Sequence, residues 1–129
     1  MLQNLNPHLQ VFHGLFRWIL LAVAVSAISV AFSGWRATKP PSPNLFRLGL
    51  IFVLAMDLEL ISGLLLYFGA SPNLRSAFIA HGVLMFFAVL SAHIGGALTR
   101  NAPSDLMKHR GPAVAWAIAL LLMLAGIPR

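Results

Sequence analysis

Long apolar segments alternate with short polar ones along the whole chain. The apolar segments run over Val11–Ser33, Phe46–Ala70, Ala77–Leu98 and Pro112–Ile127. A helix needs roughly 20 apolar residues to cross the hydrocarbon layer of a bilayer. The first three segments reach that length, and the fourth is shorter unless its helix begins in the polar sequence before Pro112. The pattern therefore predicts four membrane-spanning helices.

The connections between these segments contain residues that interrupt helices. Arg36–Asn44 includes three prolines, Ala70–Arg75 predicts a tight turn, and Arg100–Gly111 is polar. Connections this short leave no room for a second domain. We expect an all-α fold, an integral membrane four-helix bundle with up-down-up-down topology, as a single transmembrane domain over residues 1–129.

The composition supports a membrane location. Apolar residues of the AVILMFWYC set make up 59% of the 129 residues and charged residues only 9%, whereas soluble domains are about 25% charged. A chain this short could not enclose so much apolar surface in a water-soluble core. The net charge of +6 lies in short segments between apolar ones, so it argues for membrane topology and not for nucleic acid. The absence of cysteine excludes disulfides and thiolate metal sites.

The basic residues also predict an orientation. The first and third connections hold most of them: Arg36, Lys39, Arg47, Arg100, Lys108 and Arg110. The opposite side has Arg75 and Arg129, with Arg17 inside the first helix near that side. Positive charge favours the cytoplasm, so we expect a bacterial inner-membrane protein with both termini in the periplasm. The first helix is expected to be retained, because no basic segment precedes it as in a signal peptide.

The histidines fall at two depths in this topology. His13 and His81 lie near the outer ends of the first and third helices, and His93 and His109 lie toward the inner side. Small residues, which let membrane helices approach closely, share the faces of the outer pair: Ala24, Ala27 and Ala31 with His13, and Ala88, Ala92 and Gly95 with His81. We expect His13 and His81 to meet inside the bundle, and His93 and His109 form a second candidate pair.

Two facing imidazoles are suitable axial ligands for a b-type haem. Arg17 lies one turn beyond His13 on the same face, where its guanidinium could pair with a haem propionate. The pattern thus favours His13 and His81 as metal ligands and Arg17 as a cofactor contact. The competing interpretation is that these histidines suit the polar membrane interface and that Arg17 extends to the lipid headgroups.

Several short motifs occur in a familiar order: "HGLFRWILL" at His13, "LISGLLLYFGASP" at Leu60, "AHGVLMFFAVLSAHIG" at Ala80 and "KHR" at Lys108. Over nearly its whole length the chain resembles small four-span bacterial proteins known as cytochrome b-like. The resemblance implies cofactor-binding roles for His13, His81 and His109, which match histidine positions of that family. The chain departs from the pattern at Asp57, where the family tends to have histidine.

Two carboxylates, Asp57 and Glu59, lie near the middle of the second apolar segment. An acid at the bilayer centre costs about 3 kcal/mol, so we expect both to be buried polar groups. They point roughly 200° apart around a helix. Glu59 shares a face with Ser62 and Gly63 and should face the bundle interior near Arg17, His13 or His81. Asp57 faces either another helix of this chain or another subunit.

The sequence is compatible with three functions. The first is a small b-haem electron carrier, non-enzymatic, that exchanges electrons with a quinone or a protein partner. The second is an accessory subunit of a larger membrane complex without its own cofactor. The third is a proton or cation pathway through Asp57 and Glu59. Membrane lipid and other membrane subunits are the expected partners, and no hydrolase triad or phosphate-binding glycine loop is present.

Overall fold

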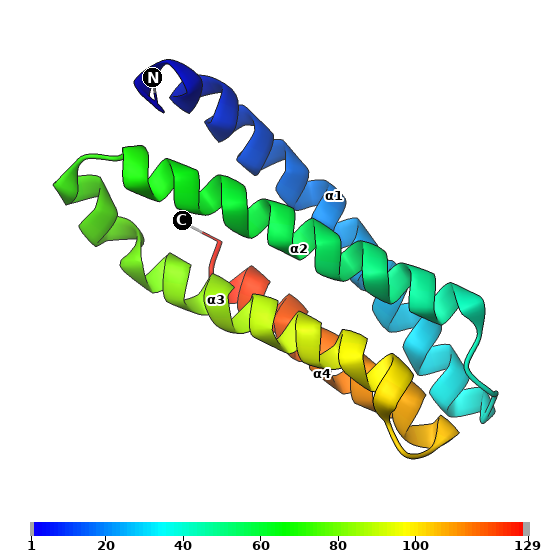
Figure 1. Cartoon of the computed structure of the whole chain (residues 1–129). Helices are drawn as coiled ribbons and strands as arrows, with labels where there is room; N and C mark the ends of the chain where they lie inside the picture. Colours follow the sequence, from blue (N-terminus) through cyan, green and yellow to red (C-terminus); the bar gives the residue numbers. More distant parts are fainter. Residues whose placement is uncertain (1, 128–129) are drawn as a thin grey trace.

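The computed structural model describes residues 2–127, which form four α-helices joined by short connections (Figure 1). The helices are α1 (Leu2–Ala37), α2 (Pro43–Gly69), α3 (Pro72–Asn101) and α4 (Asp105–Ala125). No strand occurs among these residues. The prediction of an all-α fold with four helices is confirmed.

Each helix begins before the apolar segment that predicts it, and α2 and α4 end slightly before their segments do. Serine caps explain two of the starts: Ser42 accepts a hydrogen bond from the Leu45 N–H at 3.3 Å, and Ser104 accepts one from Met107 at 3.2 Å. Such caps satisfy backbone donors that a helix leaves free at its first turn. The fourth helix accordingly begins at Asp105, well before Pro112, and the predicted turn at Ala70–Arg75 is reduced to two residues before α3.

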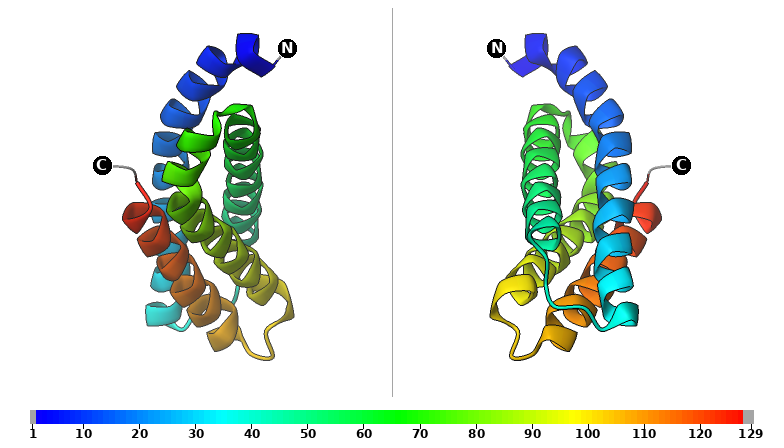
Figure 2. Two further views of the ribbon diagram at one scale, coloured as in Figure 1. Left: turned by 90° about the vertical axis from the view of Figure 1, so that its left-hand side faces the viewer. Right: turned by 90° about the vertical axis from the view of Figure 1, so that its right-hand side faces the viewer.

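The helices pack as a ring in chain order, and α1 closes the ring against α4. Successive helices run in opposite directions, so the α1–α2 and α3–α4 connections lie together at one end of the bundle (Figures 1 and 2). We call this the basic end, because its residues include Arg36, Lys39, Lys108 and Arg110. The α2–α3 connection lies at the other end, here called the outer end. Arg129 lies outside the described residues.

Small residues form much of the core. The faces predicted to point inward are buried: Leu20, Ala24, Ala27 and Ala31 of α1, and Ala88, Ala92 and Gly95 of α3. Trp116 of α4 is fully buried, packs against Gly49 and Gly95, and donates its indole N–H to the Ala92 carbonyl at 3.1 Å. Close helix approach at alanine and glycine thus leaves room for one large side chain that links α4 to α3.

Three helices are long and apolar enough to cross a membrane: Asn6–Ala37, Pro43–Gly69 and Pro72–Asn101. Their outward faces carry exposed large apolar side chains such as Leu54, Phe68 and Ile79. A soluble monomer rarely exposes so much apolar surface. The first turns of α4 hold Asp105, Lys108 and Arg110, which shortens its apolar part, so a membrane span by α4 stays a prediction.

Candidate functional site

Polar groups from all four helices meet toward the outer end. They are His13 and Arg17 of α1, Glu59 and Ser62 of α2, His81 of α3, and the backbone carbonyl of Gly126 at the end of α4. We call these the outer polar cluster. The buried core residues of the bundle are mostly apolar, so the cluster is a local polar site.

His13 and His81 lie side by side at the centre of this cluster. Their ring centroids are 6.4 Å apart and their planes are inclined by 82°. The prediction that the two histidines meet inside the bundle is therefore confirmed. Two imidazoles that share one metal ion have ring centres roughly 6 Å apart when each metal–nitrogen bond is about 2 Å, so this separation fits a shared ion.

Hydrogen bonds to α2 assign the tautomer of His13. Its Nδ1 lies 2.9 Å from Ser62 Oγ and 3.1 Å from Glu59 Oε1. The Ser62 hydroxyl donates its hydrogen to the Glu59 backbone carbonyl at 2.9 Å, so its oxygen is left to accept. Nδ1 of His13 therefore carries the proton, and the lone pair of the neutral ring is on Nε2.

The end of α4 assigns the tautomer of His81 in the same way. Its Nδ1 lies 2.5 Å from the Gly126 carbonyl oxygen. A carbonyl can only accept, so Nδ1 of His81 is also protonated and Nε2 has the lone pair. The bond satisfies one of the carbonyls that a helix leaves free at its C-terminus. Both imidazoles thus have one nitrogen held by a fixed acceptor and the other available as a ligand atom.

Two further atoms of the cluster are buried without a hydrogen-bond partner among residues 2–127. They are Arg17 Nε and Glu59 Oε2. The Arg17 guanidinium lies 5.4 Å from the centroid of the Trp18 ring, and that cation–π contact does not use the Nε hydrogen. Buried polar atoms without partners are uncommon. Their presence here indicates that the cluster has unused capacity to bind a polar or charged group.

The glycines around the cluster show where the helices pack closely and where space is open. A Cβ on Gly63 would lie 3.2 Å from Cε1 of His13, so α2 packs tightly behind that ring. A Cβ on Gly14 or Gly82 would meet nothing within 4 Å. These two glycines directly follow His13 and His81 in the sequence. Successive residues of a helix point about 100° apart, so this open space lies on the helix face next to that of each histidine.

The donor set of the cluster suits a metal held by two histidines. Within the described part of the chain, no group of three or more histidine, aspartate, glutamate or cysteine residues is arranged to hold a metal ion. A metal bound at His13 and His81 would need its other ligands from a cofactor. A porphyrin supplies four such ligands in its plane.

Glu59 lies where it was predicted, and Asp57 does so in part. The Glu59 side chain is 12% exposed and faces the interior, whereas the Asp57 side chain is 38% exposed. Asp57 is therefore less buried than predicted, but it does face another helix of this chain, which was one of the two predicted alternatives. Its Oδ1 lies 2.7 Å from Nε2 of His93 on α3, whose side chain is 47% exposed.

His93 and His109 do not form a second site. His93 pairs with Asp57 on the outer surface of α2 and α3, whereas His109 is buried between α4 and α1 at the basic end. The candidate pair fails because His93 faces outward from α3. His109 also lies at the opposite end from His13 and His81, so it cannot share a cofactor site with them.

Sequence reasoning missed two partners of the histidines. The Gly126 carbonyl could not be identified, because a backbone acceptor has no side-chain signal. The Asp57–His93 pair could have been sought as two polar residues in neighbouring apolar helices.

Comparison of the chain with known protein families, with curated proteins and with solved structures finds no match in any of the three. The functional interpretation therefore depends on the geometry of the site.

Proposed function

We propose that this protein is a small membrane electron carrier that holds one b-type haem between His13 and His81. The observation that carries the proposal is the pair of neighbouring imidazoles, 6.4 Å apart, whose Nδ1 atoms are both committed to acceptors on other helices. This leaves two Nε2 lone pairs, one from α1 and one from α3, which would hold the iron of a haem.

The other members of the outer polar cluster fit the remaining needs of a haem. The Arg17 guanidinium, with its unpartnered buried Nε, would bind a propionate. When bound, the haem would supply reversible one-electron chemistry, because its iron changes oxidation state.

The protein residues would orient the ligands and adjust their basicity. Ser62 and the Glu59 carboxylate hold the His13 ring, and the Gly126 carbonyl holds the His81 ring. Acceptors on the second ring nitrogen make an imidazole a stronger ligand and fix its direction. Glu59 is the one carboxylate of the cluster, and in its ionised form it would favour the oxidised, more positive state of a bound iron.

The proposed function includes insertion in a membrane. Three helices have the required length and apolarity, and the basic end has the residues that favour the cytoplasm. We place the basic end at the cytoplasmic face of a bacterial inner membrane and the outer polar cluster toward the periplasmic face. A quinone or a membrane-protein partner would exchange electrons at that face.

The decisive experiment is an absorption spectrum of protein purified in detergent from cells with ample haem. We expect a Soret band and sharp α and β bands that appear on reduction and disappear on oxidation. His13→Ala and His81→Ala should each abolish the spectrum. His8→Ala is the control, because His8 is exposed in the first turns of α1 and should leave the bands unchanged. Wild-type protein without haem under these conditions would refute the proposal.

An accessory subunit without a cofactor is the second candidate, and the Asp57–His93 pair favours it. This polar pair is partly exposed on a face where α2 and α3 otherwise present apolar side chains such as Leu54, Leu90 and Ile94. A neighbouring membrane helix would shield the pair from lipid. Copurification of one partner at a fixed ratio, lost in an Asp57→Leu, His93→Leu double variant, would support this function. A cofactor-free monomer that captures no partner would count against it.

A further inference from the structure

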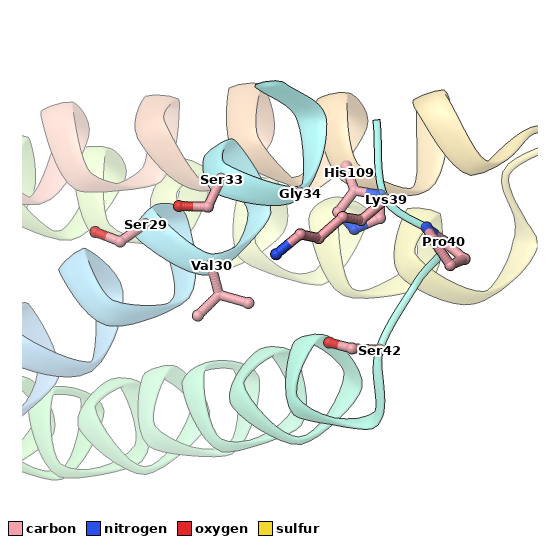
Figure 3. Close-up of a pocket in the computed structure, with 8 residues that line it drawn as sticks. All are labelled: Ser29, Val30, Ser33, Gly34, Lys39, Pro40, Ser42 and His109. Carbon is pink, nitrogen blue, oxygen red and sulfur yellow. The ribbon is translucent and has the colours of Figure 1, made fainter. Parts of the chain in front are cut away.

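A second polar feature, independent of the outer polar cluster, lies at the basic end. A cavity of about 320 Å³ opens between the end of α1, the loop that follows it, the start of α2 and the first turns of α4 (Figure 3). We call it the basic-end cavity; it is lined by Ser29, Val30, Ser33, Gly34, Lys39, Pro40, Ser42 and His109. Its lining combines two nitrogen groups with three hydroxyls and contains no carboxylate.

His109 forms the inner wall of this cavity. The residue is 3% exposed, and its Nδ1 donates to the Asp105 carbonyl at 3.0 Å. Its ring lies against the backbone of Gly34, where an added Cβ would overlap the imidazole. Nε2 has no protein partner among the described residues. The buried ring therefore closes the cavity on the side of α4.

The turn after α1 brings Lys39 over the same cavity. Thr38 has a positive φ of 52°, the Thr38 N–H bonds to the Trp35 carbonyl, and the Lys39 N–H bonds to the Gly34 carbonyl. This arrangement ends the helix and reverses the chain. The Lys39 side chain then folds back so that its amine points toward Ser29 and Ser33 (Figure 3). No carboxylate lies within salt-bridge distance of Lys39 in residues 2–127.

Two serines have a hydroxyl hydrogen that no protein group accepts within the described residues. Ser33 forms no side-chain hydrogen bond there, and Ser42 only accepts, from the Leu45 N–H at 3.3 Å. Ser29 differs, because it donates to the Val25 carbonyl at 2.7 Å. Ser42 also caps the start of α2, where the helix dipole favours negative charge. The cavity therefore presents hydrogen-bond donors from α1, from the loop and from the start of α2.

We infer that the basic-end cavity binds a phosphate group. Lys39 supplies a positive charge, and Ser33 and Ser42 supply hydroxyl donors from opposite walls. A tetrahedral phosphate has enough acceptor oxygens to use donors that come from several directions. The group can belong to an anionic phospholipid headgroup or to free phosphate, and the volume leaves room for the glycerol part of a lipid. This inference does not depend on haem.

Native mass spectrometry of the delipidated protein tests the inference. Phosphatidylglycerol and inorganic phosphate are titrated in separate arms, because the two sources share the recognised group. We expect one equivalent to bind in at least one arm. Loss of a charged hydrogen bond weakens binding by about tenfold or more, so Lys39→Met should show that loss, and Ser33→Ala a smaller one. Both residues are exposed, so both variants should fold.

Lys108→Met is the matched control. Lys108 lies at the same end of the bundle and lines neither of the cavities found there, so its loss should change the affinity by less than about twofold, as expected for distant charges. Equal weakening by Lys39→Met and Lys108→Met would overturn the inference, because it would show only general attraction to a basic surface. Failure of both probes to bind the wild-type protein would also overturn it.

Discussion

At the residue scale, the position of a proton on each histidine ring gives this bundle its chemistry. His13, His81 and His109 all use Nδ1 to donate to an acceptor, and in each case that acceptor lies on a helix or at its end. The Nε2 atoms are left for other partners. The rings of His13 and His81 lie together at the outer end, and the ring of His109 lines the basic-end cavity. The same side chain therefore serves two sites that the bundle keeps apart.

The fit of His109 against Gly34 gives a residue-scale prediction. Gly34→Ala should lower the free energy of unfolding by about 1–3 kcal/mol, because the new methyl group overlaps a buried ring that cannot move away. Thermal unfolding in detergent, followed by tryptophan fluorescence, measures the loss. Gly14→Ala is the control on the same helix, since a Cβ there meets nothing within 4 Å. Similar destabilisation by both variants would contradict this packing.

Trp116 gives a second residue-scale prediction. Trp116→Phe removes the indole bond to the Ala92 carbonyl, which keeps its bond within α3, and replaces a fully buried ring by a smaller one. The lost hydrogen bond and the space left in the core should together cost about 1–3 kcal/mol, readable as a lower thermal midpoint by circular dichroism. Trp18→Phe is the comparison, because Trp18 is 61% exposed and should change stability little. An unchanged midpoint for Trp116→Phe would show that the indole N–H is not needed.

At the scale of helices, the buried face of each helix could be predicted from the sequence, but the residues that pair between neighbouring helices could not. A periodicity of 3.6 residues assigned Ala24, Ala27 and Ala88 to the interior, and all three are fully buried. If α2 and α3 ran antiparallel side by side, residues equally far from the Ala70–Ser71 connection would face each other. Asp57 would then lie opposite Leu84. The structure pairs Asp57 with His93, because α3 crosses α2 at an angle (Figure 2). Crossing angles arise from packing between helices, which periodicity within one helix does not report.

The link between α2 and α3 can be measured by a double-mutant cycle. The cycle compares Asp57→Ala, His93→Ala and the double variant with the wild type. The expected coupling free energy is about 0.6 kcal/mol and does not exceed about 2 kcal/mol, as for other polar contacts between membrane helices. The pair is partly exposed, which keeps its contribution small. Unfolding of each variant in mixed detergent gives the four values. A coupling of zero would mean that the two side chains do not meet in the membrane-embedded protein.

At the scale of the whole molecule, alternating apolar and polar segments were sufficient to predict the number and order of the helices. They could not predict which polar groups would meet, because His13, Glu59, His81 and Gly126 are far apart in the chain and converge only when four helices close into a ring. The basic-end cavity was missed for the same reason. The residues that line it come from three helices and a loop, and no short sequence motif contains them.

The orientation of the whole bundle can be tested with single cysteines, since the chain has none of its own. Ser71→Cys lies in the α2–α3 connection, and Pro40→Cys lies in the α1–α2 loop. In intact bacterial cells, a maleimide that cannot cross the inner membrane should label Ser71→Cys and should leave Pro40→Cys unlabelled until the cells are lysed. The reverse pattern would place the basic end outside and contradict the proposed topology.

The hydrogen bond between Asp57 and His93 has a consequence for how the protein would enter a bilayer. Their separation of 2.7 Å lets the two groups hold one shared proton, and the net charge of the pair is then zero whichever group carries it. Either residue alone, on a single helix in hydrocarbon, would cost up to about 3 kcal/mol. Insertion of α2 and α3 together, as one hairpin that already contains the bond, avoids most of that cost. The pair would therefore favour a biogenesis step in which these two helices leave the translocon as a unit.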